Sequence, residues 1–271
     1  MKFTESVKVV VNEHIKNPLQ IVNMANKDLK KQFSGTALGA AWPLIKNIIF
    51  VFAYWFTIQI GLKGTTKSIK QPYIVWLVIG LVPWFFIRDT LVPAASSIRK
   101  NRYLVTKMVF PTSIISTFRV LSGFISSFMF VAVAIIMCLA HGIYPSIYWL
   151  QAIYYALAAF ILLVAISFTT SALVVVSRDI EFLLNSIIVL IFWVSPILWP
   201  IANIKDPLLS TIVKLNPFFY VIEGFREAIL YHKWFWHSPI LTLYFWAVVL
   251  ILMLLGIFIH GKLRDYFADI L

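Results

Sequence analysis

The sequence predicts an all-α polytopic membrane protein, and two observations carry that prediction. The first is a run from Val120 to Ser177, 58 residues long, that contains no Lys, Arg, Asp or Glu. About 20 apolar residues make one bilayer crossing, so this run holds two helices and a turn at His141-Gly142. The second is composition, because 61% of the residues are hydrophobic, only 13% are charged and the mean hydropathy is +0.89. Soluble domains carry about a quarter charged residues.

The 271 residues form one membrane domain with six predicted transmembrane helices. Their approximate bounds are 45–62, 73–87, 114–140, 148–176, 182–201 and 241–260. Prolines inside these spans are tolerated where neighbouring helices satisfy the freed carbonyls. More Lys and Arg fall on the side that holds both termini than on the other side, which predicts a cell-membrane protein with both termini in the cytoplasm.

The N-terminal segment, residues 1–35, is too charged to cross the membrane. Asn17-Pro18 has the form of a helix start, with Asn as the N-cap and Pro at the first helical position. Apolar residues then recur every three or four positions opposite a lysine-rich face, which predicts an amphipathic helix in the cytoplasmic interface. A plain membrane anchor and a docking element for a partner are both open roles for it.

Residues 202–233, between the fifth and sixth spans, are predicted to form two short helices. They start at Asp206-Pro207 and Asn216-Pro217, by the same cap-then-proline pattern. The second is too short and too polar to span, so we expect both to enter and leave from the outer side. Its apolar face lies opposite three charged residues, Glu223, Arg226 and Glu227. Charges are costly in lipid, so we expect these three to face outer water or a passage.

The sequence contains no recognisable catalytic site, so we expect no enzyme activity from this chain alone. It has no phosphate-binding loop, no Cys or His spacing typical of a metal site, and a single cysteine, Cys138, which lies in an apolar run. We expect this chain to bind no cofactor, no metal and no nucleic acid. All 11 acidic residues lie outside the predicted spans, which disfavours a proton-driven carrier, because carriers keep ionisable groups at membrane depth.

Two cytoplasmic segments are candidate docking surfaces for a partner. The first, from Ser96 to Pro111, is strongly basic, and the second, before the fifth span, pairs two carboxylates. Their charged residues are Arg99, Lys100, Arg102 and Lys107 in the first and Arg178, Asp179 and Glu181 in the second. Binding of anionic lipid is an equally good explanation of the first. A metal or acid–base site is the alternative for the second.

Aromatic residues make up 16% of the chain and are candidates for a glycan passage. The candidates are Tyr54, Trp55 and Phe56 in the first span and Trp84 and Phe85 in the second. Sugar rings have apolar faces that stack on aromatic rings, so such a surface suits a polymer of sugars. Membrane-interface belts and core packing are the alternative explanation.

Several motifs resemble one known family. They are Leu38-Gly39-x-x-Trp42, Ala53-Tyr54-Trp55-Phe56, Val82-Pro83-Trp84-Phe85-Phe86, Arg178-Asp179, Ser195-Pro196-Ile197-Leu198-Trp199, the run 214–226 containing Asn216-Pro217-Phe218-Phe219-Tyr220, and Arg264-Asp265-Tyr266-Phe267. Over nearly its whole length the chain resembles the permease subunits of ABC-2-type polysaccharide exporters, most closely those that translocate wall teichoic acid.

The resemblance implies a homodimer of this chain with two copies of a separate ATP-binding subunit, which binds ATP and Mg²⁺. Its substrate is a polymer linked through diphosphate to a polyprenyl lipid and moved from the cytoplasmic to the outer side. The interfacial helix and the two cytoplasmic segments are then the coupling elements. We further expect the two outer helices to form the outward gate, with Phe218, Phe219, Glu223, Arg226 and Glu227 as its residues.

Other function classes stay open. Permeases for O-antigen or capsule polysaccharide share most of these motifs, and a drug- or lipid-exporting permease of the same superfamily has no need of a wide aromatic passage. A secondary carrier is disfavoured by the placement of the acids. A membrane-embedded glycan-modifying enzyme has only Asp179 and Glu181 as a paired acid site.

Overall fold

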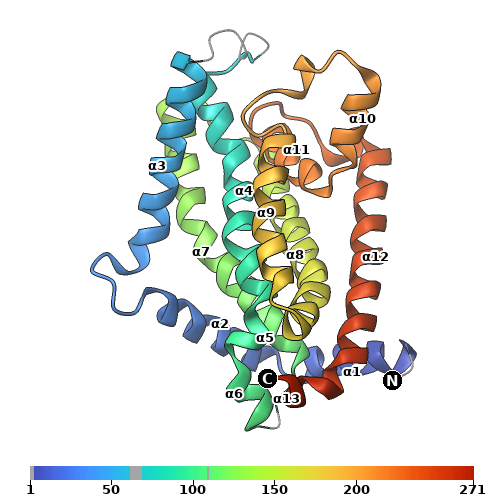
Figure 1. Ribbon diagram of the computed structural model, residues 1–271. Helices are drawn as coiled ribbons and strands as arrows, with labels where there is room; N and C mark the ends of the chain where they lie inside the picture. Colours follow the sequence, from blue (N-terminus) through green and yellow to red (C-terminus); the bar gives the residue numbers. More distant parts are fainter. Residues whose placement is uncertain (1–2, 62–68, 109) are drawn as a thin grey trace.

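The computed structural model describes residues 3–61, 69–108 and 110–271, and over these ranges the chain forms helices and turns but no strands (Figure 1). The α-helices are α1 (Phe3–Lys16), α2 (Pro18–Phe33), α3 (Trp42–Phe56), α4 (Tyr73–Ala95), α5 (Ser97–Lys100), α6 (Arg102–Thr106), α7 (Ser113–Ala140), α8 (Leu150–Val176), α9 (Asp179–Val194), α10 (Pro207–Leu215), α11 (Pro217–Ile229), α12 (Pro239–Leu263) and α13 (Phe267–Ile270). A π-helical turn, Thr57–Gly61, extends α3.

Within the described ranges, five helical segments are long and apolar enough to cross a membrane, which supports a polytopic membrane protein. They are Trp42–Gly61, Tyr73–Ala95, Ser113–Ala140, Ile147–Val176 and Pro239–Ile270. The remaining predicted span corresponds to α9, which has 16 residues. At 1.5 Å per residue it extends about 24 Å, less than the hydrocarbon core of about 30 Å. The count of six spans therefore stays a prediction.

Two helix ends differ from the predicted ends of their spans. The second span is predicted to reach about residue 87, whereas its helix, α4, continues to Ala95. The fifth does not reach residue 201, because Ser195 adopts extended backbone before Pro196 and ends α9 at Val194. The first was predicted to end at residue 62, which lies outside the described residues.

The basic segment that follows α4 is more ordered than a loop. It folds into the two short helices α5 and α6, which lie at the end of the bundle that holds both termini (Figure 1). Ile98 and Leu104 anchor them in a small apolar cluster with Phe267 of α13. The segment is therefore a shaped surface rather than an extended chain.

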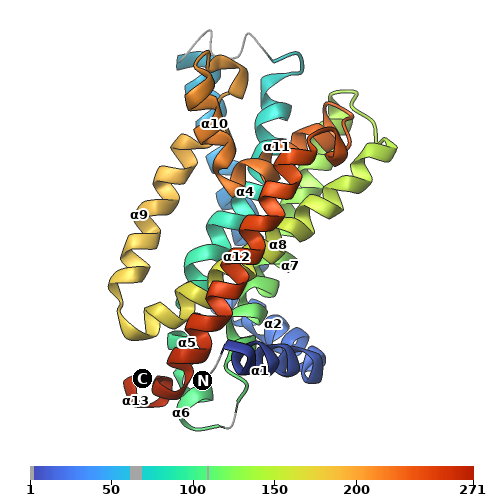
Figure 2. The same ribbon diagram turned by 90° about the vertical axis from the view of Figure 1, so that its right-hand side faces the viewer.

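The centre of the bundle is formed by α4 and α8 (Figures 1 and 2). Of the 18 most apolar consecutive residues in each segment, 83% are buried in α4 and 67% in the segment of α8, whereas only 17% are buried in the segments of α3 and α7. Helices α3, α7, α9 and α12 thus surround the centre and keep large apolar side chains on their outer faces, for example Phe52, Ile136, Trp193 and Leu250. Such faces suit lipid or a second subunit.

Two helices, not one, precede the bundle. α1 and α2 lie across its terminal end (Figure 2), with Asn17 between them. The predicted Asn17 cap is wrong: its side chain donates to the Glu13 carbonyl at 2.8 Å and makes no capping bond to α2. Pro18 still begins α2, as Pro at a first helical position should.

The outer helices start where the sequence predicts. Asp206 accepts a hydrogen bond from the Leu208 N–H at 2.8 Å, and Asn216 accepts one from the Phe218 N–H at 3.0 Å. Both are N-caps in extended backbone followed by proline. α10 and α11 lie at the end of the bundle opposite the termini (Figure 1), where we expect the outer side.

Candidate functional site

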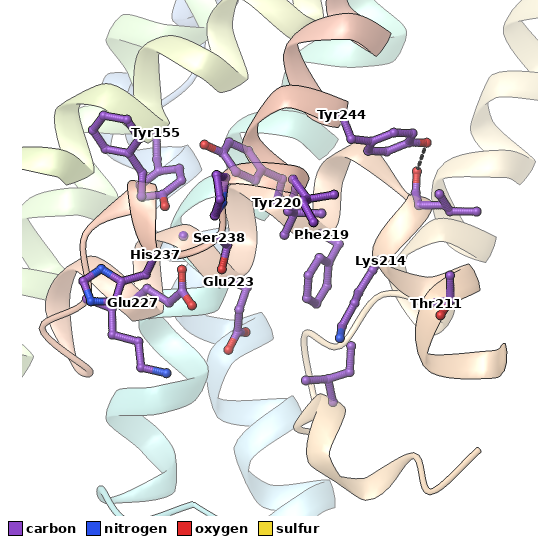
Figure 3. A pocket seen from close by; sticks show the side chains of 18 residues that line it. Tyr155, Thr211, Lys214, Phe219, Tyr220, Glu223, Glu227, His237, Ser238 and Tyr244 are labelled. Atoms are coloured by element: carbon purple, nitrogen blue, oxygen red, sulfur yellow. Dashed lines mark hydrogen bonds between the residues drawn. The ribbon is translucent and has the colours of Figure 1, made fainter. Parts of the chain in front are cut away.

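A cavity of about 670 Å³ lies at the outer end of the molecule, between α11, the end of α10, α8 and the segment that leads into α12 (Figure 3). Its walls combine carboxylates, amines and aromatic rings. The carboxylates are Glu223 and Glu227, the amines are Lys214 and Lys233, and the aromatic rings include Phe219, Tyr220, Phe235 and Tyr244. Of the residues named for the outer gate, Phe219, Glu223 and Glu227 line this cavity, and Phe218 is buried beside it.

The two carboxylates come from one face of α11. Glu223 and Glu227 are four residues apart, so they lie one helical turn from each other, and both are half-buried on the wall of the cavity (Figure 3). Burial, and after it the negative charge of Glu223, raise the pKa of the Glu227 carboxyl, while Lys233 opposes them. The cavity therefore holds a carboxyl that accepts a proton more readily than an exposed glutamate.

Aromatic rings form the apolar part of the cavity. Tyr220 is fixed from three sides, by stacking on Phe245 with ring centres 4.4 Å apart and by hydrogen bonds to the hydroxyls of Tyr154 at 2.9 Å and Thr242 at 3.1 Å. The Tyr244 hydroxyl donates to the Leu215 carbonyl at 2.8 Å and so links α12 to α10. Fixed rings beside carboxylates and amines offer both stacking and hydrogen bonds, which is what a polyhydroxylated ring requires.

Gly224 brings α11 close enough to α8 to build this wall. A side chain at this position would overlap the ring of Tyr155, which is buried between the two helices. The Tyr155 ring packs edge-on against Tyr220, 5.3 Å between centres. The glycine thus sets the depth of the cavity floor.

Arg226 does not lie in the cavity, and its prediction as a residue facing water or a passage is wrong. Its side chain is fully buried on the other side of α11, between α11 and α4. It lies 3.4 Å above the Trp76 ring and donates to the carbonyls of Pro196 at 2.6 Å and Ile197 at 2.8 Å. A weaker contact of 3.2 Å joins it to Glu223.

The reason lies in two other parts of the chain. The turn after α9 presents carbonyls that no helix bonds, and Gly80 on α4 lacks the side chain that would occupy the guanidinium's place. A guanidinium with five N–H donors satisfies such carbonyls, which makes burial of the charge tolerable. A proline-terminated helix near a glycine in a neighbouring span is the signal that sequence reasoning missed.

The aromatic residues predicted for a glycan passage separate into two groups. Tyr54 and Trp84 meet through Phe192 of α9, with ring centres 5.0 and 5.5 Å from it. Phe85 packs instead against Phe130 of α7, at 4.9 Å. Trp84 and Phe85 are 1% and 2% exposed, so within one chain their faces are occupied by neighbouring side chains. A role for this set in a passage stays a prediction.

Trp55 and Phe56 lie near Phe52 on α3. Phe52 is within 6.2 Å of both rings, and Phe56 is half exposed on the outside of the bundle. Phe56 therefore faces whatever covers α3, which is lipid or a second subunit. Trp55 is instead partly buried against the core, as Tyr54 is.

The two predicted docking segments lie side by side. Arg99 donates to the carbonyl of Val174, near the end of α8, at 3.4 Å, which joins the first segment to the chain that leads into the second. Lys100, Arg102, Arg178 and Asp179 are exposed, and Glu181 is half-buried. The two segments therefore form one continuous surface of mixed charge at the terminal end.

No metal site is present among the residues that the structure describes, since they contain no group of three His, Cys, Asp or Glu side chains placed to hold an ion. The Asp179 carboxylate accepts a hydrogen bond from the Ser177 hydroxyl at 3.1 Å, and the Asp179 N–H lies 3.2 Å from the same hydroxyl. The alternative of a metal or acid–base site at Asp179 and Glu181 thus gains no support.

Comparison with known proteins gives consistent results. The family model described as ABC-2 type transporter matches residues 19–230, which run from α2 to the end of α11. Two proteins of Klebsiella pneumoniae named O-antigen export system permease protein RfbA are 27% and 28% identical, each over 93% of this chain and 94% of the relative. A protein of the same name from Myxococcus xanthus is 22% identical over 92% of this chain and 94% of its own length.

Proposed function

This chain belongs to the ABC-2 type transporter family, and we propose that it is the transmembrane permease of an ATP-driven polysaccharide exporter. The observation that carries the proposal is the extent of the similarity to O-antigen export permeases, which spans 92% or more of both partners in each comparison. A similarity of that extent includes the bundle, both docking segments and the outer helices. Family membership makes the chain a transmembrane subunit and not itself a catalyst.

The outer cavity supports the same proposal on physical grounds. A polysaccharide that leaves the membrane has repeating rings with apolar faces and hydroxyl edges. The cavity offers the ring of Phe219 and the carboxylates of Glu223 and Glu227 within one space of about 670 Å³. Aromatic faces and charged acceptors together bind such rings without demanding one sugar, which suits a polymer that slides.

The polymer itself belongs to the proposal. We propose a polysaccharide carried on a polyprenyl diphosphate, and the names of the relatives favour the O-antigen type that the sequence analysis held as an alternative. Wall teichoic acid, which the motif resemblance favoured, has no support from these relatives. A drug- or lipid-exporting permease is the remaining rival.

We further propose that two copies of this chain assemble with two copies of an ATP-binding subunit, which carries the ATP and Mg²⁺. The docking surface for that subunit is the continuous face of α5, α6 and residues 177–181. Exposed charge on that face is supplied by Lys100, Arg102 and Arg178. The large apolar side chains on the outer faces of α3 and α9 are the surface for the second copy and for lipid.

The export proposal is tested in a strain that lacks its own O-antigen permease. The chain is expressed with its ATP-binding subunit, and polymer at the cell surface is detected by labelling of intact cells. We expect surface polymer to return, and to be lost when the nucleotide site of the ATP-binding subunit is inactivated. Polymer that stays inside the cells although both subunits are present in the membrane would contradict the proposal.

The docking proposal is tested by reversing charge on the exposed residues only. Lys100→Glu with Arg102→Glu should lower co-purification of the ATP-binding subunit or separate ATP turnover from export. Lys262→Glu is the matched control, because Lys262 is exposed at the same end but lies outside the proposed face. If the double variant and the control behave alike, the basic segment does not dock the ATP-binding subunit, and lipid binding explains its charge instead.

The outward gate is a separate proposal for α10 and α11. Its test places single cysteines at Glu223 and Glu227, which line the cavity, in a Cys138→Ala background. Crosslinks between two copies that form at rest and stop export when locked would support a gate. Full export with the helices locked together would eliminate it.

A further inference from the structure

A second cavity, of about 490 Å³, lies toward the terminal end of the bundle, among α2, the start of α3, α4, α7 and α9. Three cationic side chains from three different helices line it: Lys46 of α3, Arg88 of α4 and Arg119 of α7. Asp89 lines it as well. The three cationic residues are at least 31 positions apart in the sequence, so they lie close together only in the folded chain.

The cavity walls hold more positive than negative charge. Lys46 Nζ and Arg88 Nε both lie 2.9 Å from one oxygen of the Asp89 carboxylate, Oδ1, so two cations share one counter-charge. Arg119 is paired with Asp28 of α2, whose carboxylate lies 3.3 Å from it. Three cations therefore face two carboxylates. Excess charge in a low-dielectric bundle is costly, and an anion in the cavity relieves that cost.

Protein contacts hold Arg88 firmly, whereas Arg119 makes only long ones. The Arg88 guanidinium donates to both oxygens of Asp89 and to the Asn47 side-chain oxygen at 2.8 Å, and it lies 4.7 and 4.5 Å from the ring centres of Phe50 and Phe85. The contacts of Arg119 to Asp28, Ser122 and Gln32 are all 3.3 to 3.4 Å, longer than the 2.7 to 2.9 Å of strong charge-assisted bonds. Positioned N–H groups with long contacts are available for a stronger acceptor.

The remaining walls of the cavity combine polar and apolar side chains, and its polar residues are Gln32, Thr36, Ser126 and Asn185. Trp42 and Pro43 at the start of α3 and Val92 and Ile188 on the facing helices line it beside the charges. Trp42 is half exposed, so the cavity opens next to the apolar outer face of α3. A ligand that fits both parts carries a compact anionic group joined to an apolar chain, as a phosphorylated lipid does.

We propose that this cavity binds the diphosphate of the lipid carrier on the cytoplasmic side, with Lys46, Arg88 and Arg119 as its ligands. The inference rests on the proposed function, which supplies a polyprenyl diphosphate as the anchor of the polymer. The three cations reach the oxygens from three helices, while the lipid chain leaves along the apolar outer face of α3. Binding here places the first sugar of the polymer at the entrance of the bundle.

The test measures binding, which needs neither export nor the ATP-binding subunit. The purified full-length chain is placed in phosphatidylcholine nanodiscs and titrated with farnesyl diphosphate, a short polyprenyl diphosphate, and binding is followed by native mass spectrometry. We expect saturable binding that Lys46→Gln weakens about tenfold, since one charge-assisted contact is lost. Lys46 is chosen because its side chain is 38% exposed and its one ion pair is to Asp89, so the variant keeps the fold.

The matched control is Lys30→Gln, which removes one positive charge from the exposed face of α2 without altering the cavity. It should bind farnesyl diphosphate as the unmodified chain does. An equal loss in both variants would mean a general electrostatic effect and would overturn the site. Unchanged binding in Lys46→Gln, or in Arg119→Gln as a second variant, would overturn it too.

Three competitors identify the source of the phosphate. Farnesol, which lacks the diphosphate, should not compete, and inorganic pyrophosphate and phosphatidylglycerol should compete at least tenfold more weakly than the diphosphate lipid. Equal competition by pyrophosphate would assign the cavity to free phosphates, and equal competition by phosphatidylglycerol to bulk lipid; either result would overturn the proposal. If the unmodified chain binds farnesyl diphosphate but does not restore polymer at the cell surface, the result counts against the proposed function and not against this site.

Discussion

At the outer end, α11 is joined to α4 by one fully buried guanidinium, whereas at the terminal end α1 and α2 are joined to the bundle by several polar pairs that are only partly buried. Arg226 is enclosed by main-chain carbonyls and a tryptophan ring. At the terminal end, Glu13 lies 2.6 Å from Arg264, with side chains 12% and 28% exposed, and the exposed Gln32 donates to the Ser122 hydroxyl at 2.8 Å. Breaking a buried charge contact leaves unpaired groups without water, while an exposed pair is replaced by water at little cost.

This difference matters for a transporter. Elements held by exposed pairs separate and rejoin without a large penalty, as α1 and α2 must if they pass motion from an ATP-binding subunit. The contacts of Arg226 hold α11 to the central helix α4, so we expect any movement at this end to occur on the cavity side of α11.

Replacement of the buried guanidinium has the largest expected effect. Arg226→Leu leaves the carbonyls of Pro196 and Ile197 buried without donors, so we expect a loss of about 3 kcal/mol or more in stability. The measurement is the thermal unfolding midpoint of the purified protein in detergent. Arg226→Lys keeps the charge but loses the planar guanidinium with its several donors. Its unfolding midpoint should therefore fall between those of the unmodified chain and Arg226→Leu. An unchanged midpoint for Arg226→Leu would show that the joint is not needed.

Filling the space that the guanidinium occupies tests the same joint from α4. Gly80→Ala introduces a methyl group that overlaps the Arg226 guanidinium, so we expect a loss of about 1–3 kcal/mol. In an Arg226→Leu background the same substitution should cost much less, because the group it displaces has gone. Equal costs in both backgrounds, measured as a double-mutant cycle, would locate the strain elsewhere on α4.

At the terminal end, loss of one ionic contact should have a small effect. Glu13→Gln keeps a polar partner for the Ser113 hydroxyl but removes the charge facing Arg264, so we expect a loss of about 1 kcal/mol or less. Salt should shrink the difference from the unmodified chain, because it screens half-exposed pairs. Asp265→Asn, an exposed acid at the same end, serves as the control. A loss as large as that of Arg226→Leu would erase the contrast between the two ends.

The smallest effect concerns Glu227 and has a defined direction with pH. Because burial raises the pKa of this carboxyl in the folded protein, its ionised form opposes folding, and stability rises as pH falls through the folded-state pKa. Glu227→Gln should therefore raise the unfolding midpoint slightly near neutral pH, by less than about 1 kcal/mol in stability, and the gain should vanish once the native carboxyl is protonated.

The measurement for Glu227 is the unfolding midpoint as a function of pH, with Glu181→Gln at the opposite end as the control for loss of one negative charge. A gain that is independent of pH, or one that Glu181→Gln reproduces, would contradict the raised pKa as its cause.

Much of the architecture follows from local sequence. Long runs without charged residues avoid water, so hydropathy sets the positions of α7, α8 and α12. Their observed bounds lie within a few residues of the predicted ones. Asp206 and Asn216 act as N-caps because the capping bond reaches two residues along the chain and needs no distant partner. Asn17 has the same local pattern, yet its side chain bonds back to α1, since a preceding helix offers a competing carbonyl.

Local sequence is enough to predict the class of the protein, its apolar spans and the starts of its outer helices, because each depends on residues close together in the chain. Which charged residues meet depends instead on how the helices pack. Helical periodicity placed Arg226 on a polar face with Glu223 and Glu227, but a glycine on α4 and free carbonyls after α9 drew it into the interior. Likewise Lys46, Arg88 and Arg119 form one cavity wall only because three helices pack together, and no spacing along the chain records a contact between helices.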